Sequence, residues 1–123
     1  MRLTSRCPHG ATSFEDLGVI RVLDTGDGGA KLRRFVRDWL GPLLDYDTHN
    51  RSHLVRTLSH HLDCGGNYDH TAAALVIHRS TLRYRLQRIR EISGLDLAEA
   101  GNRLNLHVAT RAWRILDGPQ GRT

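Results

Sequence analysis

Five arginines lie between Val76 and Arg90, and no acidic residue interrupts them. The net charge of the whole chain is +5, so this short segment carries the entire excess and the rest of the chain is balanced. A guanidinium group binds phosphate, and a concentrated arginine patch attracts a nucleic-acid backbone by releasing its condensed counterions. Charge alone is more often a mark of a solvated arginine-rich face. The structure expected around these arginines therefore decides between a nucleic-acid-binding surface and a solvated face.

The same segment has the spacing of two helices joined by a tight turn. One face of the second helix is apolar, with residues recurring at three and four: Leu82, Leu86 and Ile89. The first helix offers small residues, Ala72 and Ala73, where the second helix must cross it closely. The apolar residues Leu75 and Ile77 flank the turn and are expected to pack inward. This arrangement predicts a helix-turn-helix, whose second helix enters the major groove of DNA.

The residues left on the outer face of this second helix, about 79–93, are suited to reading base edges. Arginine matches guanine, glutamine matches adenine, and serine is adaptable. We expect the base-reading set to be Arg79, Ser80, Arg83, Tyr84 and Gln87. Arg85, Arg88 and Arg90 lie nearer the sides and are expected to contact phosphates, which position the helix without specifying sequence. His78 and Thr81, at the start of the helix, complete the predicted DNA-binding residues.

The rest of the chain predicts a small all-α bundle of about five helices. The expected helices span about 30–41, 50–63, 69–75, 79–93 and 103–116. Gly41-Pro42 should stop or kink the first helix. Asn50 or Ser52 is expected to cap the second helix and Asn67 or Asp69 the third, while Gly94 ends the fourth. The last helix should present an apolar stripe of Leu104, Leu106, Val108, Ala109, Ala112, Trp113 and Leu116.

Three regions are expected along the chain. Residues 1–30 are weakly patterned and are interpreted as a residual upstream segment and linker. Residues 31–117 should form the helix-turn-helix domain, and residues 118–123 a disordered tail.

Other chemistry is weakly supported. His49 and His53, like His60 and Cys64, have metal-ligand spacing on a helix, but exposed histidines without a paired cysteine motif are the better interpretation. Cys7 and Cys64 are too few and too far apart for a disulfide framework and are expected to be reduced thiols. No catalytic set, nucleotide loop or membrane-spanning run is present. We therefore expect a cytoplasmic protein that is not an enzyme and needs no cofactor or metal.

The runs from Leu54 to Leu58, from Cys64 to Asn67 and from Leu75 to Leu86 resemble the C-terminal domain of PucR-type regulators. The family includes activators of purine catabolism and of sugar-diacid use, and the resemblance covers about residues 14–116. Two residues depart from its pattern. Val76 occupies the turn, where many helix-turn-helix proteins have glycine, and Ser80 stands where the family suggests asparagine.

The resemblance implies a sequence-specific DNA-binding domain that acts in transcription on double-stranded DNA. Specific sites usually contain two half-sites, so a homodimer is expected, through either residues 35–39 or residues 108–116. Family members carry N-terminal sensory and central domains, and we expect the effector-sensing domain to be absent from this chain. The alternative is a protein-interaction module whose basic face meets an acidic partner. Dependence on base sequence would separate the two.

Overall fold

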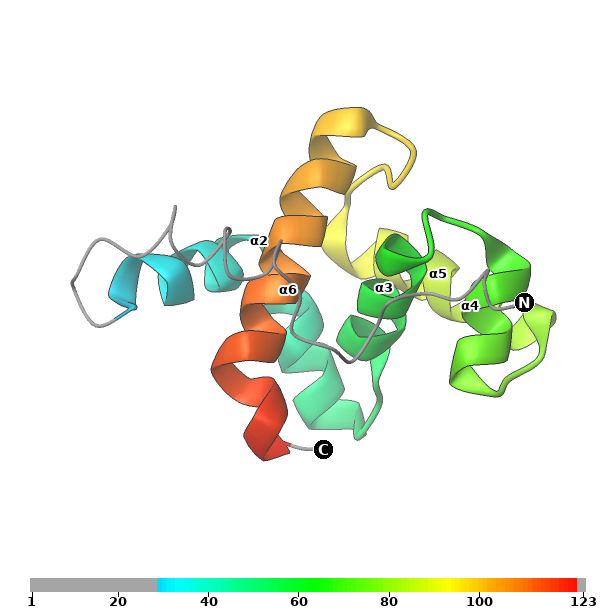
Figure 1. Cartoon of the computed structure of the whole chain (residues 1–123), viewed down its shortest axis with the longest axis horizontal. Helices are drawn as coiled ribbons and strands as arrows, with labels where there is room; N and C mark the ends of the chain where they lie inside the picture. Colours follow the sequence, from blue (N-terminus) through cyan, green and yellow to red (C-terminus); the bar gives the residue numbers. More distant parts are fainter. Residues whose placement is uncertain (1–28, 122–123) are drawn as a thin grey trace.

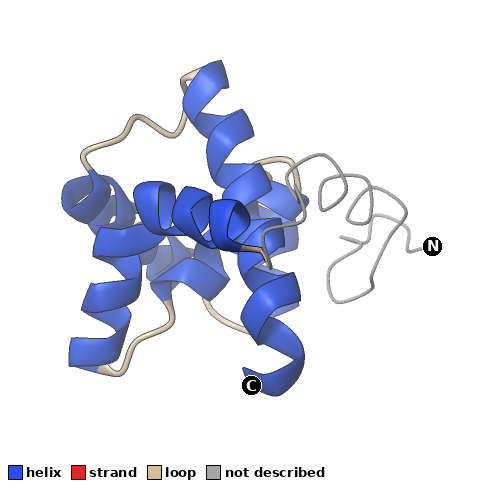
Figure 2. Ribbon diagram, turned by 90° about the vertical axis from the view of Figure 1, so that its left-hand side faces the viewer, coloured by secondary structure: helices blue, strands red, loops and turns tan. Residues whose placement is uncertain are grey.

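The computed structural model describes residues 29–121, with side chains to residue 116. In this part of the chain there are five α-helices and no strand: α2 (Ala30–Asn50), α3 (Leu54–Asp63), α4 (Tyr68–Leu75), α5 (Arg79–Ser93) and α6 (Ala100–Gly121) (Figures 1 and 2). The predicted all-α fold is confirmed. The predicted upstream segment and most of the linker lie outside the described residues, and the division into three regions stays a prediction.

Helix α3 lies at the centre of the bundle and contacts the four other helices. Its apolar side chains Leu54, Val55, Leu58 and Leu62 are buried. They meet a fully buried layer from the neighbouring helices, which includes Leu40, Leu86 and Leu106. Burying a side chain of this size contributes about 1.5–3 kcal/mol. This shared core therefore fixes α5 against the rest of the domain.

Helix α2 continues through Gly41-Pro42, although proline lacks a backbone N–H and its ring crowds the preceding turn. The axis of α2 changes direction about midway along its length (Figure 1). Of the two outcomes predicted for this dipeptide, a kink is therefore observed and a stop is not. The helix ends at Asn50 and is followed by the C-cap residue Arg51, whose backbone is left-handed (φ 53°).

The start of α3 was predicted incorrectly. It begins at Leu54, and neither Asn50 nor Ser52 caps it. Asp47 of α2 does so instead, since its two carboxylate oxygens accept from the backbone N–H groups of Leu54 (2.8 Å) and Val55 (3.0 Å). The Ser52 hydroxyl donates to the same carboxylate at 2.6 Å. A carboxylate at a helix N-terminus also interacts favourably with the positive end of the helix dipole. Asp47 therefore joins α2 firmly to α3.

Helix α6 is longer than predicted at both ends, and one member of its predicted stripe is wrong. Leu104 is 65% exposed, whereas Leu106 is fully buried. Residues two apart on a helix point about 200° apart, so Leu104 must face away from the core that Leu106 enters. Trp113 packs against the core as a partly buried residue, as expected for a member of the stripe, and so does Trp39 of α2.

A buried ionic cluster, absent from the sequence-based expectations, joins α3 to α6. The side chain of Asp63 has no exposed surface. Its carboxylate accepts from His107 Nε2 and Arg114 Nη1, each at 2.8 Å, and Arg111 Nη2 lies 3.4 Å away. A buried carboxylate needs such compensation, because burying it alone costs several kcal/mol.

Three further expectations concern a membrane-spanning helix, a metal site and the state of the cysteines. No helix in the described region is long and apolar enough to cross a membrane. Nor do three or more histidine, cysteine or acidic side chains gather there as a metal site would require. The expectation of two reduced thiols is contradicted at Cys64, which is disulfide-bonded. Cys7 lies outside the described residues.

Candidate nucleic-acid interface

Helices α4 and α5 form the predicted helix-turn-helix. Asn67 caps α4, since its side-chain oxygen accepts from the backbone N–H of His70 at 2.9 Å. The buried Ala72 allows close packing of the two helices, whereas its neighbour Ala73 is exposed. Leu75 and Ile77 pack against the core on either side of the turn. The second helix begins at Arg79 and ends at Gly94 (φ 72°), as predicted.

The turn closes without glycine because Val76 itself adopts the left-handed conformation (φ 57°). The backbone N–H groups of Val76 and Ile77 donate to the carbonyls of Ala73 (3.2 Å) and Ala72 (3.0 Å), which ends α4 in a tight cap. This backbone is an outlier for a β-branched residue. The side chain of Val76 is 89% exposed.

The two faces of α5 differ as the sequence predicted. Leu82, Leu86 and Ile89 have no exposed surface. The five predicted base-reading residues are all exposed: Arg79, Ser80, Arg83, Tyr84 and Gln87. His78 is also exposed and stands at the N-cap, and Thr81 is half-buried. The rigid inner face therefore presents the polar face at a fixed angle. Whether these residues contact DNA stays a prediction.

Arg79 has partners within the protein. Its Nε lies 3.6 Å from the Asp69 carboxylate, and its guanidinium carbon lies 5.8 Å from the centre of the Tyr68 ring. Both partners come from the first turn of α4. Exposed pairs of this kind contribute little to stability, but they orient the Arg79 side chain toward the first turn of α4.

The arginines on one flank of α5 are engaged by other helices. Arg85 Nη1 donates to Thr57 Oγ1 of α3 at 3.2 Å. Arg88 donates to Glu91 at 2.8 Å and to the Tyr46 hydroxyl of α2 at 3.2 Å, with its guanidinium 5.2 Å from the Tyr46 ring centre. These hydrogen bonds, first to Tyr46 and then to Glu91, raise the pKa of Arg88 above its ordinary value.

Tyr46, Thr57 and Glu91 were not singled out from the sequence. Glu91 follows the arginine segment directly, and its pKa is lowered chiefly by the hydrogen bond from Arg88. For Arg88 to bind phosphate, it would have to exchange Glu91 and Tyr46 for the DNA. Arg79, at the start of α5, instead meets α4 through Tyr68 and Asp69.

The comparisons with known proteins agree with this geometry. Residues 54–112 match the PucR C-terminal helix-turn-helix domain. The match begins at the first residue of α3 and ends within α6, so it includes the whole helix-turn-helix. The match confirms, over these residues, the predicted resemblance to the helix-turn-helix domain of PucR-type transcriptional regulators.

The chain is similar to several curated regulators. The DNA-binding transcriptional activator AdeR of Bacillus subtilis is 30% identical over 96 residues, which are 78% of this chain and 23% of that protein. The purine catabolism regulatory protein of the same organism is 30% identical over 98 residues, 80% of this chain and 18% of that one.

The carbohydrate diacid regulator of Escherichia coli is 59% identical over 39 residues, 32% of this chain and 10% of the regulator. The chain therefore spans less than a quarter of the length of each of these three relatives. No solved structure gives a significant match.

Proposed function

We propose that this domain binds double-stranded DNA in a sequence-specific manner and regulates transcription, with α5 in the major groove. The observation that carries the proposal is the exposed face of α5, which presents Arg79, Arg83 and Gln87 while its opposite face is locked in the core. A helix that reads bases must be held in register, because specificity depends on the placement of a few side chains.

The contacts within the protein suggest that the arginines of α5 have different roles in DNA binding. Arg83 is exposed and belongs to none of the ion pairs found in the described residues, so it is the strongest candidate to read a base. Arg85 and Arg88 are already hydrogen-bonded within the protein. Their contribution to DNA binding would be weaker and would not depend on sequence.

We further propose that the domain acts as a cytoplasmic homodimer on paired half-sites. A single helix-turn-helix buries limited surface, and two copies double the number of bases read. The half-buried aromatic pair Phe35–Trp39, with ring centres 6.4 Å apart, and the segment around Trp113 remain the two candidate dimer surfaces.

The decisive experiment selects a duplex from a random library and compares it with a scrambled duplex by fluorescence anisotropy at about 150 mM salt. We expect a preference of about a thousandfold for the selected duplex. Arg83→Ala should reduce this preference, whereas the distant Arg34→Ala serves as a matched control. Equal, weak binding to both duplexes by the dimeric protein would contradict the proposal and favour an acidic protein partner for the basic face.

A further inference from the structure

We propose that Val76, in the turn between α4 and α5, contacts the 5-methyl group of a thymine in the major groove and adds to the sequence preference of the domain. This proposal rests on the proposed function, because the ligand is a base of the bound duplex. Val76 was not among the predicted DNA-binding residues. The sequence marked it only as a departure from the glycine that many helix-turn-helix proteins have in the turn.

The fold makes almost no use of the Val76 side chain. Its neighbours Leu75 and Ile77 pack against the core, whereas Val76 is the most exposed large apolar residue in the part of the chain that the structure describes. The cap that ends α4 uses backbone atoms alone, since the N–H groups of Val76 and Ile77 donate to the carbonyls of Ala73 and Ala72. A glycine would make the same hydrogen bonds, so the turn does not require a valine side chain.

The backbone of Val76 is strained as well as exposed. Its φ of 57° and ψ of 51° lie in the left-handed region, which is an outlier for a β-branched residue. Strained backbone conformations cluster where a protein binds its ligand, because the surrounding structure holds them in place for that purpose. A strained side chain that the core does not use is therefore a candidate for contact with an external ligand.

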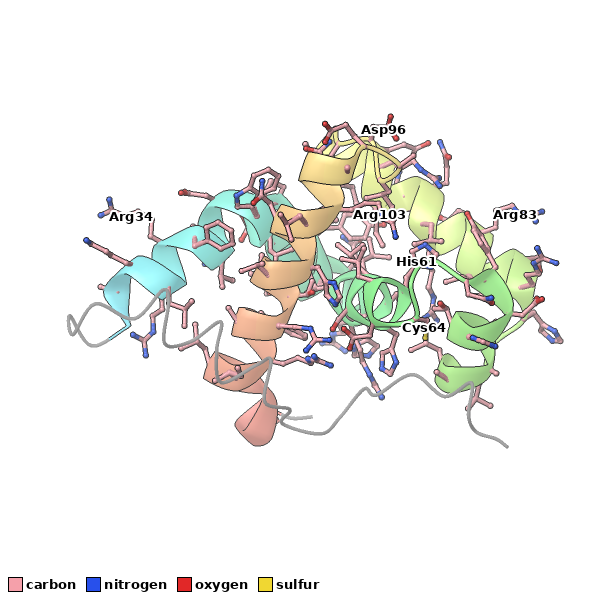
Figure 3. All side chains as sticks on the ribbon, turned by 45° about the horizontal axis from the view of Figure 1, so that its top comes forward. Arg34, His61, Cys64, Arg83, Asp96 and Arg103 are labelled. Carbon is pink, nitrogen blue, oxygen red and sulfur yellow. The ribbon has the colours of Figure 1, made fainter. Side chains whose placement is uncertain are left out.

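The proposed binding mode brings Val76 to the DNA. Arg79 is the first residue of α5, and the three residues from Val76 to Arg79 span at most about 11 Å of chain. The first turn of α5 is the part that contacts base edges. Figure 3 shows Arg83 of α5 at the end of the molecule opposite to Arg34, and the turn between α4 and α5 lies at the same end in Figure 1.

The chemistry of the Val76 side chain indicates which base it would contact. Valine has no side-chain hydrogen-bond donor or acceptor, so it cannot read the polar edge of a base. Thymine presents an apolar group in the major groove, its 5-methyl. Removing two apolar groups from water together stabilises the complex. A thymine methyl is therefore the part of a base that Val76 can recognise.

The test replaces each thymine of the selected duplex in turn with deoxyuridine, which lacks only the 5-methyl group. Fluorescence anisotropy measures the affinity of each duplex for the unmodified protein, for Val76→Gly and for Val76→Ile. At one thymine the unmodified protein should lose about fourfold in affinity, the effect of one methyl-sized apolar contact.

Val76→Gly should bind the unsubstituted duplex more weakly than the unmodified protein does, by at least about fourfold. It should no longer distinguish thymine from deoxyuridine at that position. Val76→Ile keeps an apolar β-branched side chain and should still distinguish them. Leu104→Ala is the matched control, because it removes an exposed apolar side chain from α6, outside the helix-turn-helix, and should leave all affinities unchanged.

Urea denaturation of each variant separates a lost contact from a damaged fold. Val76→Gly should bind more weakly without any loss of stability, whereas a purely structural valine would lower both together. The proposal is overturned if Val76→Gly binds as tightly as the unmodified protein, or if it remains sensitive to the same methyl group.

An unmodified protein that is insensitive to every thymine methyl would overturn the proposal too. In these three outcomes the preference for the selected over the scrambled duplex persists, so the proposed function stands. Equal binding of the unmodified protein to the selected and the scrambled duplex would instead contradict both the proposed function and the role of Val76.

Discussion

Arginine has two different roles in α5 and α6. On α6, Arg111 and Arg114 have side chains only 11% and 16% exposed, and both point at the buried carboxylate of Asp63. On α5, Arg83 is exposed and has no ion-pair partner in the described residues. The first arrangement uses charge to hold two helices together, and the second leaves charge available for an external anion.

The difference shows that composition alone does not separate structural from functional arginines. What separates them is the burial of the acid that faces them. A buried carboxylate such as Asp63 keeps its cations because exposing or neutralising it is costly. An exposed one, such as Asp69 beside Arg79, can exchange its partner for a phosphate at little cost.

The largest expected effect comes from removing the buried acid. Asp63→Ala should lower the free energy of unfolding by about 3–5 kcal/mol, because it leaves the cations of α6 without their buried counterion. Urea denaturation measures this change. The control is Asp45→Ala, which removes an exposed partner of Arg37 at 3.4 Å and should cost less than about 1 kcal/mol. Equal losses in the two variants would refute the distinction between buried and exposed pairs.

Acid should weaken the fold through the two buried histidines of α3. The pKa of His60 is lowered to about 4 by burial and then by Arg56, and that of His61 to about 4 by burial and then by Arg103. Between about pH 6.5 and 4, these two imidazoles bind protons in the unfolded chain but not in the folded chain. Stability is therefore complete above pH 6.5 and is lost as the pH falls toward 4.

At pH 5.5 this loss should reach about 1.4 kcal/mol for each histidine. Urea denaturation at a series of pH values measures it, and His61→Gln should flatten the profile. The exposed His49→Gln provides the control and should leave the profile unchanged. A stability that does not vary between pH 7 and 5 would contradict the prediction.

The functional arginine should show the opposite pattern to the buried cluster. Arg83→Ala should weaken binding to a specific site by about 1–3 kcal/mol and relax the preference at one base position, with little change in unfolding. Arg114→Ala should instead lower stability and leave the affinity of the folded protein unchanged. Anisotropy titrations and urea denaturation of both variants measure the two quantities. A loss of stability in Arg83→Ala would show that its charge is structural.

Local patterns made much of α4 and α5 predictable. The spacing of Leu82, Leu86 and Ile89, together with Asn67 and Gly94, determines where these helices lie and which face is buried. Partners distant in sequence were not predictable, because no periodicity marks them. Asp47 reaches across a reversal to cap α3, and Asp63 meets residues 44 and 51 positions later. The candidate site shares this limit, since no local spacing marks Tyr46 as the partner of Arg88.

The smallest expected effect lies at the C-terminal ends of α4 and α5, where the chain adopts the same left-handed backbone with different residues. Gly94 does so at φ 72° without strain, whereas Val76 does so at φ 57° with a β-branched side chain. A residue other than glycine in the left-handed conformation costs about 1–2 kcal/mol. Replacing Val76 with glycine removes this cost, but part of the gain in stability is offset because glycine increases the conformational entropy of the unfolded chain. Val76→Gly should therefore raise the free energy of unfolding by up to about 1 kcal/mol. Because the Val76 side chain is 89% exposed, little packing is lost.

Urea denaturation measures the gain in the free energy of unfolding, and Gly94→Ala, at the C-terminal end of α5, should show a loss. If Val76→Gly is destabilised, then the valine side chain contributes a contact that outweighs the backbone strain.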